Sequence, residues 1–89
     1  MRLLRRTGQF KHDVKRQIKR GKDLALLKTV VTSLAEVGSL ADTYHDHALI
    51  GGYRGSRECH LEPDWLLIYE LTEDELILIR TGSHSDLFE

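Results

Sequence analysis

The stretch Trp65–Leu71, which reads WLLIYEL, decides the fold of this chain. Its side chains are apolar at both alternating positions as far as Glu70, a pattern typical of a strand buried on both faces of a sheet. The polar segment Thr72–Glu75 predicts a turn, and Leu76–Ile79 predicts the hairpin partner of the first strand. With a further strand expected at residues 56–62, the last third of the chain predicts a mostly antiparallel sheet.

A first amphipathic helix is predicted upstream of this sheet. Thr7 is its expected N-cap, and Phe10, Val14 and Ile18 recur every four residues, which places them on one helical face. Gly21 is the expected C-terminal glycine. Basic residues cover the other faces of this helix.

A second helix is expected to begin at Asp23, its N-cap, and to close at Gly38. Its apolar positions with helical spacing are Leu26, Leu27, Val30, Val31, Leu34 and Val37. Residues 2–6 suit an edge strand, and residues 38–56, rich in glycine, suit a loop that leads into a strand. The predicted fold class is α+β in the order β-α-α-β-β-β, followed by a short C-terminal turn or helix. The helix hairpin covers one face of the sheet, and no helix is expected on the other.

Composition and charge narrow the class of protein. Eighty-nine residues predict one domain spanning 1–89, and the single cysteine, Cys59, excludes an intrachain disulfide and favours a cytoplasmic protein. No apolar run is long enough to span a bilayer, so no membrane association is expected. Residues 1–30 carry ten Lys or Arg and two acids, whereas residues 31–89 carry three and twelve. The basic N-terminal part fits contact with a polyanion such as RNA, although solvated helix faces would have the same composition.

Histidines and acids gather where the predicted strands begin and end, and these are the groups that metal-free RNA cleavage requires. One group must take the proton of the 2′-hydroxyl, another must protonate the leaving 5′-oxygen, and positive charge must lie near the phosphate. The candidate catalytic residues are His47, His60, Asp64 and His84. The candidate RNA-binding residues are Arg57, Arg80 and the aromatic residues Trp65 and Phe88, which could stack on an unstacked base.

Other interpretations of the same residues remain open. A histidine at a strand end is often only a surface residue, Trp65 could belong to the core, and Arg80 could pair with an acid. The spacing of the histidines and Cys59 matches no zinc signature, so neither a metal nor another cofactor is expected. Ser83-His84-Ser85 does not fit a nucleophile elbow. A binding module that does not cleave RNA is the principal alternative.

Three blocks of the sequence resemble one known family. They are Tyr44–Leu49 followed by Gly51, Arg57–Tyr69 with its His-Leu-Glu-Pro-Asp-Trp core, and Arg80–Phe88 with its Arg-Thr-Gly-Ser-His start. Together they are similar to YafQ-type toxins of the RelE/ParE superfamily of bacterial toxin–antitoxin systems, and the resemblance covers essentially the whole chain.

This resemblance implies a RelE-like microbial RNase fold and a ribosome-dependent mRNA endonuclease that cuts codons in the ribosomal A site without a metal. It assigns the active site to His47, His60, Asp64 and His84, with Trp65 and Phe88 beside them and Arg80 as a phosphate contact. Arg57 and Glu58 lie next to these positions. The implied partners are the ribosome, mRNA and a cognate antitoxin, with operator DNA bound only through the antitoxin complex.

Overall fold

The computed structural model describes residues 1–88 and has the predicted α+β architecture. Five strands form one sheet in the order β1-β5-β4-β3-β2. The strands are β1 (Leu3–Arg6), β2 (His47–Ala48), β3 (Arg57–Glu62), β4 (Trp65–Leu71) and β5 (Glu75–Gly82). The β1–β5 pair is parallel and the other three pairs are antiparallel, as expected for a mostly antiparallel sheet.

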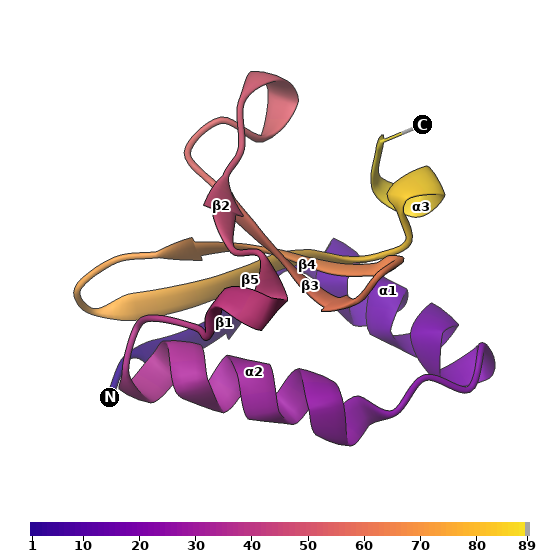
Figure 1. Cartoon of the computed structure of the whole chain (residues 1–89), viewed down its shortest axis with the longest axis horizontal. Coiled ribbons are helices and arrows are strands. Elements are labelled where there is room, and N and C mark those ends of the chain that lie inside the picture. Colours follow the sequence, from indigo (N-terminus) through magenta and orange to yellow (C-terminus); the bar gives the residue numbers. More distant parts are fainter. Residues whose placement is uncertain (89) are drawn as a thin grey trace.

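Helices α1 (Gly8–Lys19) and α2 (Leu24–Glu36) cover one face of this sheet (Figure 1). The predicted caps are confirmed, because Thr7 Oγ1 accepts from the Phe10 N–H at 3.0 Å and Asp23 Oδ1 accepts from the Ala25 N–H at 2.9 Å. Gly21 has φ of 81° at the end of α1, a left-handed conformation that glycine adopts without steric cost. No helix within residues 1–88 has the length and apolar character needed to cross a membrane.

The central strand β4 organises two hydrophobic clusters. Trp65, Leu67 and Tyr69 point toward the helices and form the main core with residues such as Phe10, Val30 and Leu34. Leu66 and Ile68 point the other way and pack against Leu87, with Leu49, Tyr53 and Ile79 around them. The alternation of the two sets follows from the two-residue period of a strand.

The prediction that no helix lies on the second face of the sheet is wrong. The short helix α3 (His84–Phe88) and the segment around the 3-10 helix η2 (Gly51–Tyr53) lie over it, as Figure 1 shows above the sheet. Leu66 and Ile68 need an apolar cover, and these two segments supply it through Leu87 and Tyr53. The open part of this face is therefore confined to the neighbourhood of β2 and β3.

The buried face of α1 also differs from the predicted one. Ile18 is about half exposed, whereas Asp13 and Gln17 are buried beside Phe10. Apolar periodicity favoured Ile18, but Asp13 is held inside by Arg80, whose Nε donates to its Oδ2 at 2.7 Å. A charged group can be buried when it is paired and hydrogen-bonded. The ion pair between Asp13 and Arg80 therefore helps to determine which face of α1 packs against the sheet.

Candidate active site

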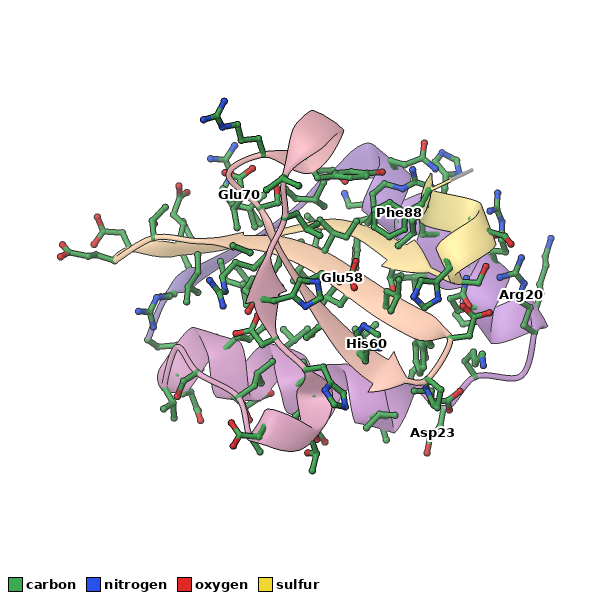
Figure 2. The ribbon with its side chains drawn as sticks, turned by 45° about the horizontal axis from the view of Figure 1, so that its top comes forward. Arg20, Asp23, Glu58, His60, Glu70 and Phe88 are labelled. Carbon is green, nitrogen blue, oxygen red and sulfur yellow. The ribbon has the colours of Figure 1, made fainter. Side chains whose placement is uncertain are left out.

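The predicted catalytic residues come from four separate segments. His47 lies on β2, His60 on β3, Asp64 in the turn between β3 and β4, and His84 at the start of α3. Figure 2 shows His60 and Glu58 projecting from β3 on the face that α1 and α2 leave open. The sheet therefore brings together residues that are up to 37 positions apart in the chain.

Their imidazole rings form a row with His60 at its centre. The ring centroids of His60 and His84 are 5.7 Å apart, and those of His60 and His47 are 6.3 Å apart. His45, which was not among the predicted site residues, adds a fourth ring at 5.7 Å from His60. Several groups able to exchange protons near neutral pH thus lie within reach of one small substrate group.

Asp64 and His84 form a close pair at one end of the row. The Asp64 carboxylate accepts the His84 backbone N–H at 2.9 Å and the ring Nδ1–H at 2.6 Å. These two hydrogen bonds lower the pKa of Asp64, so that it is a carboxylate at neutral pH. Since the carboxylate accepts from Nδ1, the Nε2 atom of His84 is left for a substrate.

Glu58 anchors the other two candidate catalytic histidines. Its Oε1 atom lies 3.1 Å from His60 Nε2 and 3.6 Å from His47 Nε2, and its side chain is buried. Glu58 and His60 are two residues apart on β3, which places them on the same face of the sheet. A buried acid placed between two imidazoles can orient both rings.

Arg57 belongs to a second carboxylate cluster beside the row. Its Nε and Nη2 donate to the two Asp46 oxygens at 3.2 and 3.4 Å, and the Tyr69 hydroxyl donates to Asp46 Oδ1 at 2.6 Å. Burial, followed by this hydrogen bond to Asp46, raises the pKa of Tyr69. The Arg57 guanidinium, for which an RNA contact was predicted, is thus already paired with an acid.

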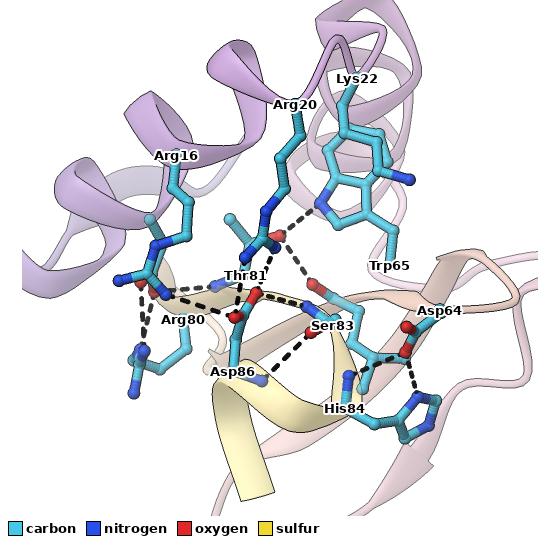
Figure 3. A network of polar contacts seen from close by, with 12 residues as sticks. Arg16, Arg20, Lys22, Asp64, Trp65, Arg80, Thr81, Ser83, His84 and Asp86 are labelled. Carbon is cyan, nitrogen blue, oxygen red and sulfur yellow. Dashed lines mark hydrogen bonds and ion pairs between the residues drawn. The ribbon is translucent and has the colours of Figure 1, made fainter. Parts of the chain in front are cut away.

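Arg80 and Trp65 lie in a buried polar chain beneath the site, part of which Figure 3 shows. Arg80 donates to both oxygens of Asp13, and Asp13 also accepts the Thr81 backbone N–H at 3.2 Å. The Trp65 indole N–H donates to Thr81 Oγ1 at 2.9 Å, and that hydroxyl donates to the Leu66 carbonyl at 2.6 Å.

The burial of Trp65 corrects its predicted role. Its side chain is completely buried, so it cannot stack on an RNA base in this structure. The apolar face of β4 toward α1 and α2 needs a large residue, and Trp65 fills that place while its N–H finds a buried partner. The interpretation of Trp65 as a core residue, left open by the sequence, is the correct one.

Asp86 links α3 to the C-terminal end of α1 and so positions His84. Its carboxylate accepts the Ser83 backbone N–H at 2.9 Å, while Ser83 Oγ accepts the Asp86 N–H at 3.1 Å, which is a capping box. Arg20 donates to both Asp86 oxygens at 2.6 and 3.1 Å, and Arg16 donates at 3.4 Å (Figure 3). The Arg20 guanidinium is the main reason that the pKa of Asp86 lies well below its usual range.

Phe88 is the aromatic side chain that remains accessible next to the site. About half of it is exposed, and its ring meets Tyr53 edge-on with the centroids 5.7 Å apart. The Tyr53 hydroxyl donates to the Leu87 carbonyl at 3.3 Å, which ties the loop at η2 to α3. The predicted stacking role of Phe88 on RNA remains a prediction that this exposure permits.

Sequence reasoning did not assign a role to Glu58, His45, Asp46 or Asp86. The position of Glu58 two residues before His60 on a predicted strand was the available signal, since both then share a face. The Ser83–Asp86 spacing matches a capping box, which was a signal for a helix start at Ser83. The contact between His45 and His60 depends on how the loop folds back, and no local pattern encodes it.

Two further observations concern metals and thiols. Within residues 1–88, no group of three or more His, Cys, Asp or Glu has an arrangement that could hold a metal ion. Cys59 is completely buried, and burial raises the pKa of its thiol to about 12. It therefore has no reactive thiolate at neutral pH.

The fold and site together define a small α+β protein with histidines and carboxylates grouped on one face of its sheet. Residues 2–89 match the family model described as the bacterial toxin of type II toxin-antitoxin system, YafQ. The chain belongs to the YafQ toxin family.

Named relatives agree with this assignment. The mRNA interferase toxin YafQ of Escherichia coli is 46% identical over 83 residues, covering 92% of this chain and 90% of that protein. The crystal structure of the Escherichia coli DinJ–YafQ complex contains a chain that superposes with a TM-score of 0.92 at 43% identity over the full length of both chains. A metal-bound toxin from Helicobacter pylori superposes with a TM-score of 0.90 at 47% identity, covering 99% of this chain and 100% of that one.

Proposed function

We propose that this protein is an mRNA endonuclease of a type II toxin–antitoxin system that cuts mRNA in the ribosomal A site. The observation that carries the proposal is the row of imidazoles His47, His60 and His84, held by Glu58 and by Asp64 on one face of the sheet. The similarity to a relative named as an mRNA interferase supports the same reaction.

The contacts favour His60 as the general base. With its Nε2–H directed at Glu58, the Nδ1 atom of His60 has a lone pair that can take the 2′-hydroxyl proton. Asp64 is a weaker candidate for this role because its carboxylate already accepts two hydrogen bonds from His84. Deprotonation lets the 2′-oxygen attack the adjacent phosphorus atom.

The same contacts favour His84 as the general acid. Asp64 accepts from His84 Nδ1 and fixes the orientation of the ring, as a carboxylate does for the histidine of a hydrolase triad. As the bond from phosphorus to the 5′-oxygen breaks, Nε2 of His84 gives its proton to that oxygen. The products are a cyclic 2′,3′-phosphate and a free 5′-hydroxyl, and the proton balance requires no metal.

His47 is the best-placed source of positive charge for the phosphate. Arg57 and Arg80 both point at acids, Asp46 and Asp13, so that much of their charge is already compensated. His47 is half exposed at the open edge of the site, and its Nε2 atom lies 3.6 Å from Glu58 Oε1. When this imidazole carries a proton, its charge faces the negative charge that builds on the phosphate oxygens.

The basic helix α1 is proposed to grip ribosomal RNA. Lys11, Lys15 and Lys19 are exposed on it, and contacts of such side chains with phosphates weaken as salt concentration rises. The further partners proposed are mRNA and a cognate antitoxin, through which alone the protein would reach operator DNA. The proposed location of the protein is the cytoplasm, where ribosomes are found.

The test is primer extension on an mRNA translated in vitro, with and without the protein. We expect in-frame cuts only when ribosomes are present, and we expect no cuts in the ribosome-free RNA control, with or without EDTA. Cuts in the ribosome-free RNA that EDTA abolishes would instead indicate a metal-dependent hydrolase. An absence of cuts by the folded protein would favour a binding module without catalytic activity.

A further inference from the structure

A cavity beside the imidazole row has no role in the chemistry described above. It has a volume of about 550 Å³, within the range of about 300–1,000 Å³ that is usual for small-molecule sites. Its lining residues are Thr43, His45, His60, Leu61, Glu62 and Pro63. We propose that this cavity is a nucleobase subsite, which holds one base of the RNA next to the phosphate that is cut. The inference rests on the proposed function and adds to it the part of the substrate that is read.

The position of the cavity fits a base adjacent to the reacting phosphate. His60 contributes to its lining, and the centroid of the same ring lies 5.7 Å from that of His84. A phosphate held between His60 and His84 would therefore direct a neighbouring nucleoside toward the cavity. The cavity also lies along the outer edge of β3, where β2 pairs only with Arg57 and Glu58 and leaves the rest of that edge uncovered.

The lining has the chemistry that recognises a flat heterocycle. The rings of His45 and His60 meet nearly edge to face, at 66° between their planes, and Leu61 and Pro63 add apolar surface. Aromatic and apolar walls bind the face of a base without regard to its identity. Thr43 adds a hydroxyl and Glu62 a carboxylate, and these can bind the edge of the base.

Glu62 sets the expected preference among bases. Lys22 Nζ donates to Glu62 Oε1 at 2.8 Å, and the same ammonium lies over the Trp65 ring, 5.9 Å from its centroid. This contact fixes the position of the carboxylate group, and a carboxylate only accepts hydrogen bonds. Adenine, cytosine and guanine present an exocyclic amino group to such an acceptor, whereas uracil offers only its N3–H, flanked by two carbonyl oxygens that repel a carboxylate. The cavity is thus expected to disfavour uracil.

The backbone conformation of His45 is an independent indication that this residue belongs to a functional site. His45 has φ of 49° and ψ of 45°, a left-handed conformation that is uncommon for residues other than glycine. Its N–H donates to the Asp42 carbonyl at 3.0 Å and its own carbonyl accepts from His47 Nδ1 at 2.8 Å, which holds it there. Strained residues of this kind concentrate at ligand sites. Glycine would be favoured at position 45 on stability alone.

The first experiment is an NMR titration of the free protein with AMP, CMP, GMP and UMP, following backbone amide resonances. We expect shifts at Thr43, His45, Leu61 and Glu62, and weaker binding of UMP by about fivefold or more, the factor that one good contact to a base edge provides. Shifts elsewhere, or equal affinity for all four nucleotides, would overturn the proposal. This titration needs no ribosome, so its result is independent of whether the protein cleaves mRNA.

The second experiment uses His45→Gly and Glu62→Gln. We expect His45→Gly to fold at least as stably as the wild type, because glycine relieves the left-handed strain, while it binds all four nucleotides more weakly. We expect Glu62→Gln to bind UMP as well as AMP, since an amide both donates and accepts. His12→Ala and Glu73→Gln, at exposed positions outside the cavity, are the matched controls and should bind as the wild type does. Wild-type binding by His45→Gly would overturn the subsite.

The cleavage assay then separates this proposal from the proposed function. If the wild type cuts mRNA on the ribosome, His45→Gly should raise the apparent KM, and Glu62→Gln should let the protein accept codons that the wild type disfavours. Unchanged codon preference and KM in both variants would overturn the subsite while leaving the nuclease intact. Failure of the wild type to cut would overturn the nuclease, and the nucleotide titration would still decide the cavity.

Discussion

Asp13 and Asp64 make contacts of nearly the same length and yet do different things. Asp13 accepts from Arg80 at 2.7 Å and Asp64 accepts from His84 at 2.6 Å. The Asp13 side chain is 1% exposed, whereas that of Asp64 is 66% exposed. The difference shows that burial, and not hydrogen-bond length, separates a carboxylate that holds the fold from one available for chemistry.

Two other carboxylates lie between these extremes. Asp86 is 11% exposed and joins α3 to α1, and Asp46 is 20% exposed and joins Arg57 to Tyr69. If burial sets the role, the cost of removing these carboxylates should fall from Asp13 through Asp86 and Asp46 to Asp64. Their effects on catalysis need not follow the same order, because the distance of each from the imidazole row differs.

The largest expected effect is on cleavage and concerns His84, the partner of the exposed carboxylate Asp64. His84→Ala should lower in-frame cleavage by about 10²–10⁴-fold, the usual contribution of a general acid, while folding and antitoxin binding stay as in the wild type. Primer extension and a binding assay measure the two properties. Glu73→Gln, at an exposed position in the turn between β4 and β5, is the control and should cleave normally. Full cleavage by His84→Ala would remove His84 from the mechanism.

The second-largest expected effect is on stability and concerns the buried carboxylate Asp13. Asp13→Ala should lower the free energy of unfolding by about 3–5 kcal/mol, because it leaves the Arg80 guanidinium without its partner in a largely buried place. Urea unfolding followed by circular dichroism measures this change. Asp64→Ala is the matched control and should lower the unfolding midpoint much less, because it removes only solvent-exposed hydrogen bonds to His84. Equal unfolding midpoints for the two variants would contradict the conclusion that burial determines the role of each carboxylate.

A smaller effect is expected for Asp86→Asn, and it should depend on pH. The folded state lowers the pKa of Asp86, so its contribution to stability is complete above the ordinary aspartate pKa of about 3.9 and is lost as pH falls below it. The stability difference between wild type and variant should therefore be constant from pH 7 to about 5 and shrink below about pH 4.

The same variant has a catalytic readout. Looser attachment of α3 should reduce cleavage at neutral pH less than His84→Ala does, because the imidazole is displaced and not removed. Asp86→Glu keeps the charge and should recover part of the lost activity. A stability difference that grows on acidification would contradict the assigned role of Asp86.

The smallest effect is expected at Asp46. Tyr69→Phe removes the hydroxyl that donates to Asp46 and should destabilise the fold by about 0.5–1.5 kcal/mol, with cleavage unchanged because Asp46 keeps its pair with Arg57. Urea unfolding of Tyr69→Phe and of Tyr53→Phe gives the comparison. Tyr53 makes a longer bond, 3.3 Å, to the Leu87 carbonyl, and its loss should cost less.

Much of the fold was predictable because local patterns encode it. The apolar run of β4, the caps Thr7 and Asp23 and the glycines at 21 and 38 determine where elements begin and end through interactions within a few residues. The orientation of α1 was not predictable in the same way. Its buried residues Asp13 and Gln17 are polar, and only contacts with β5 explain the burial of Asp13.

The candidate site was predictable by residue type and only partly by geometry. The sequence indicated His47, His60, Asp64 and His84 as a group, and the structure places them together. It also indicated Trp65 as a stacking residue, which was wrong, because whether an aromatic residue at a strand start faces core or solvent depends on the register of the whole sheet. Glu58 and His45 join the site through that register and through the loop that precedes β2.

By itself, the sequence determined the α+β class, the ends of the helices, the central strand and the set of groups able to move protons. Each of these depends on neighbours along the chain or on the chemistry of single side chains. Only the tertiary structure decided that Asp13 is buried, that Trp65 is core, that Asp86 fastens α3 to α1 and that His45 and Glu62 border a cavity. These depend on contacts between residues distant in sequence, whose burial and pairing are defined only once the sheet has assembled.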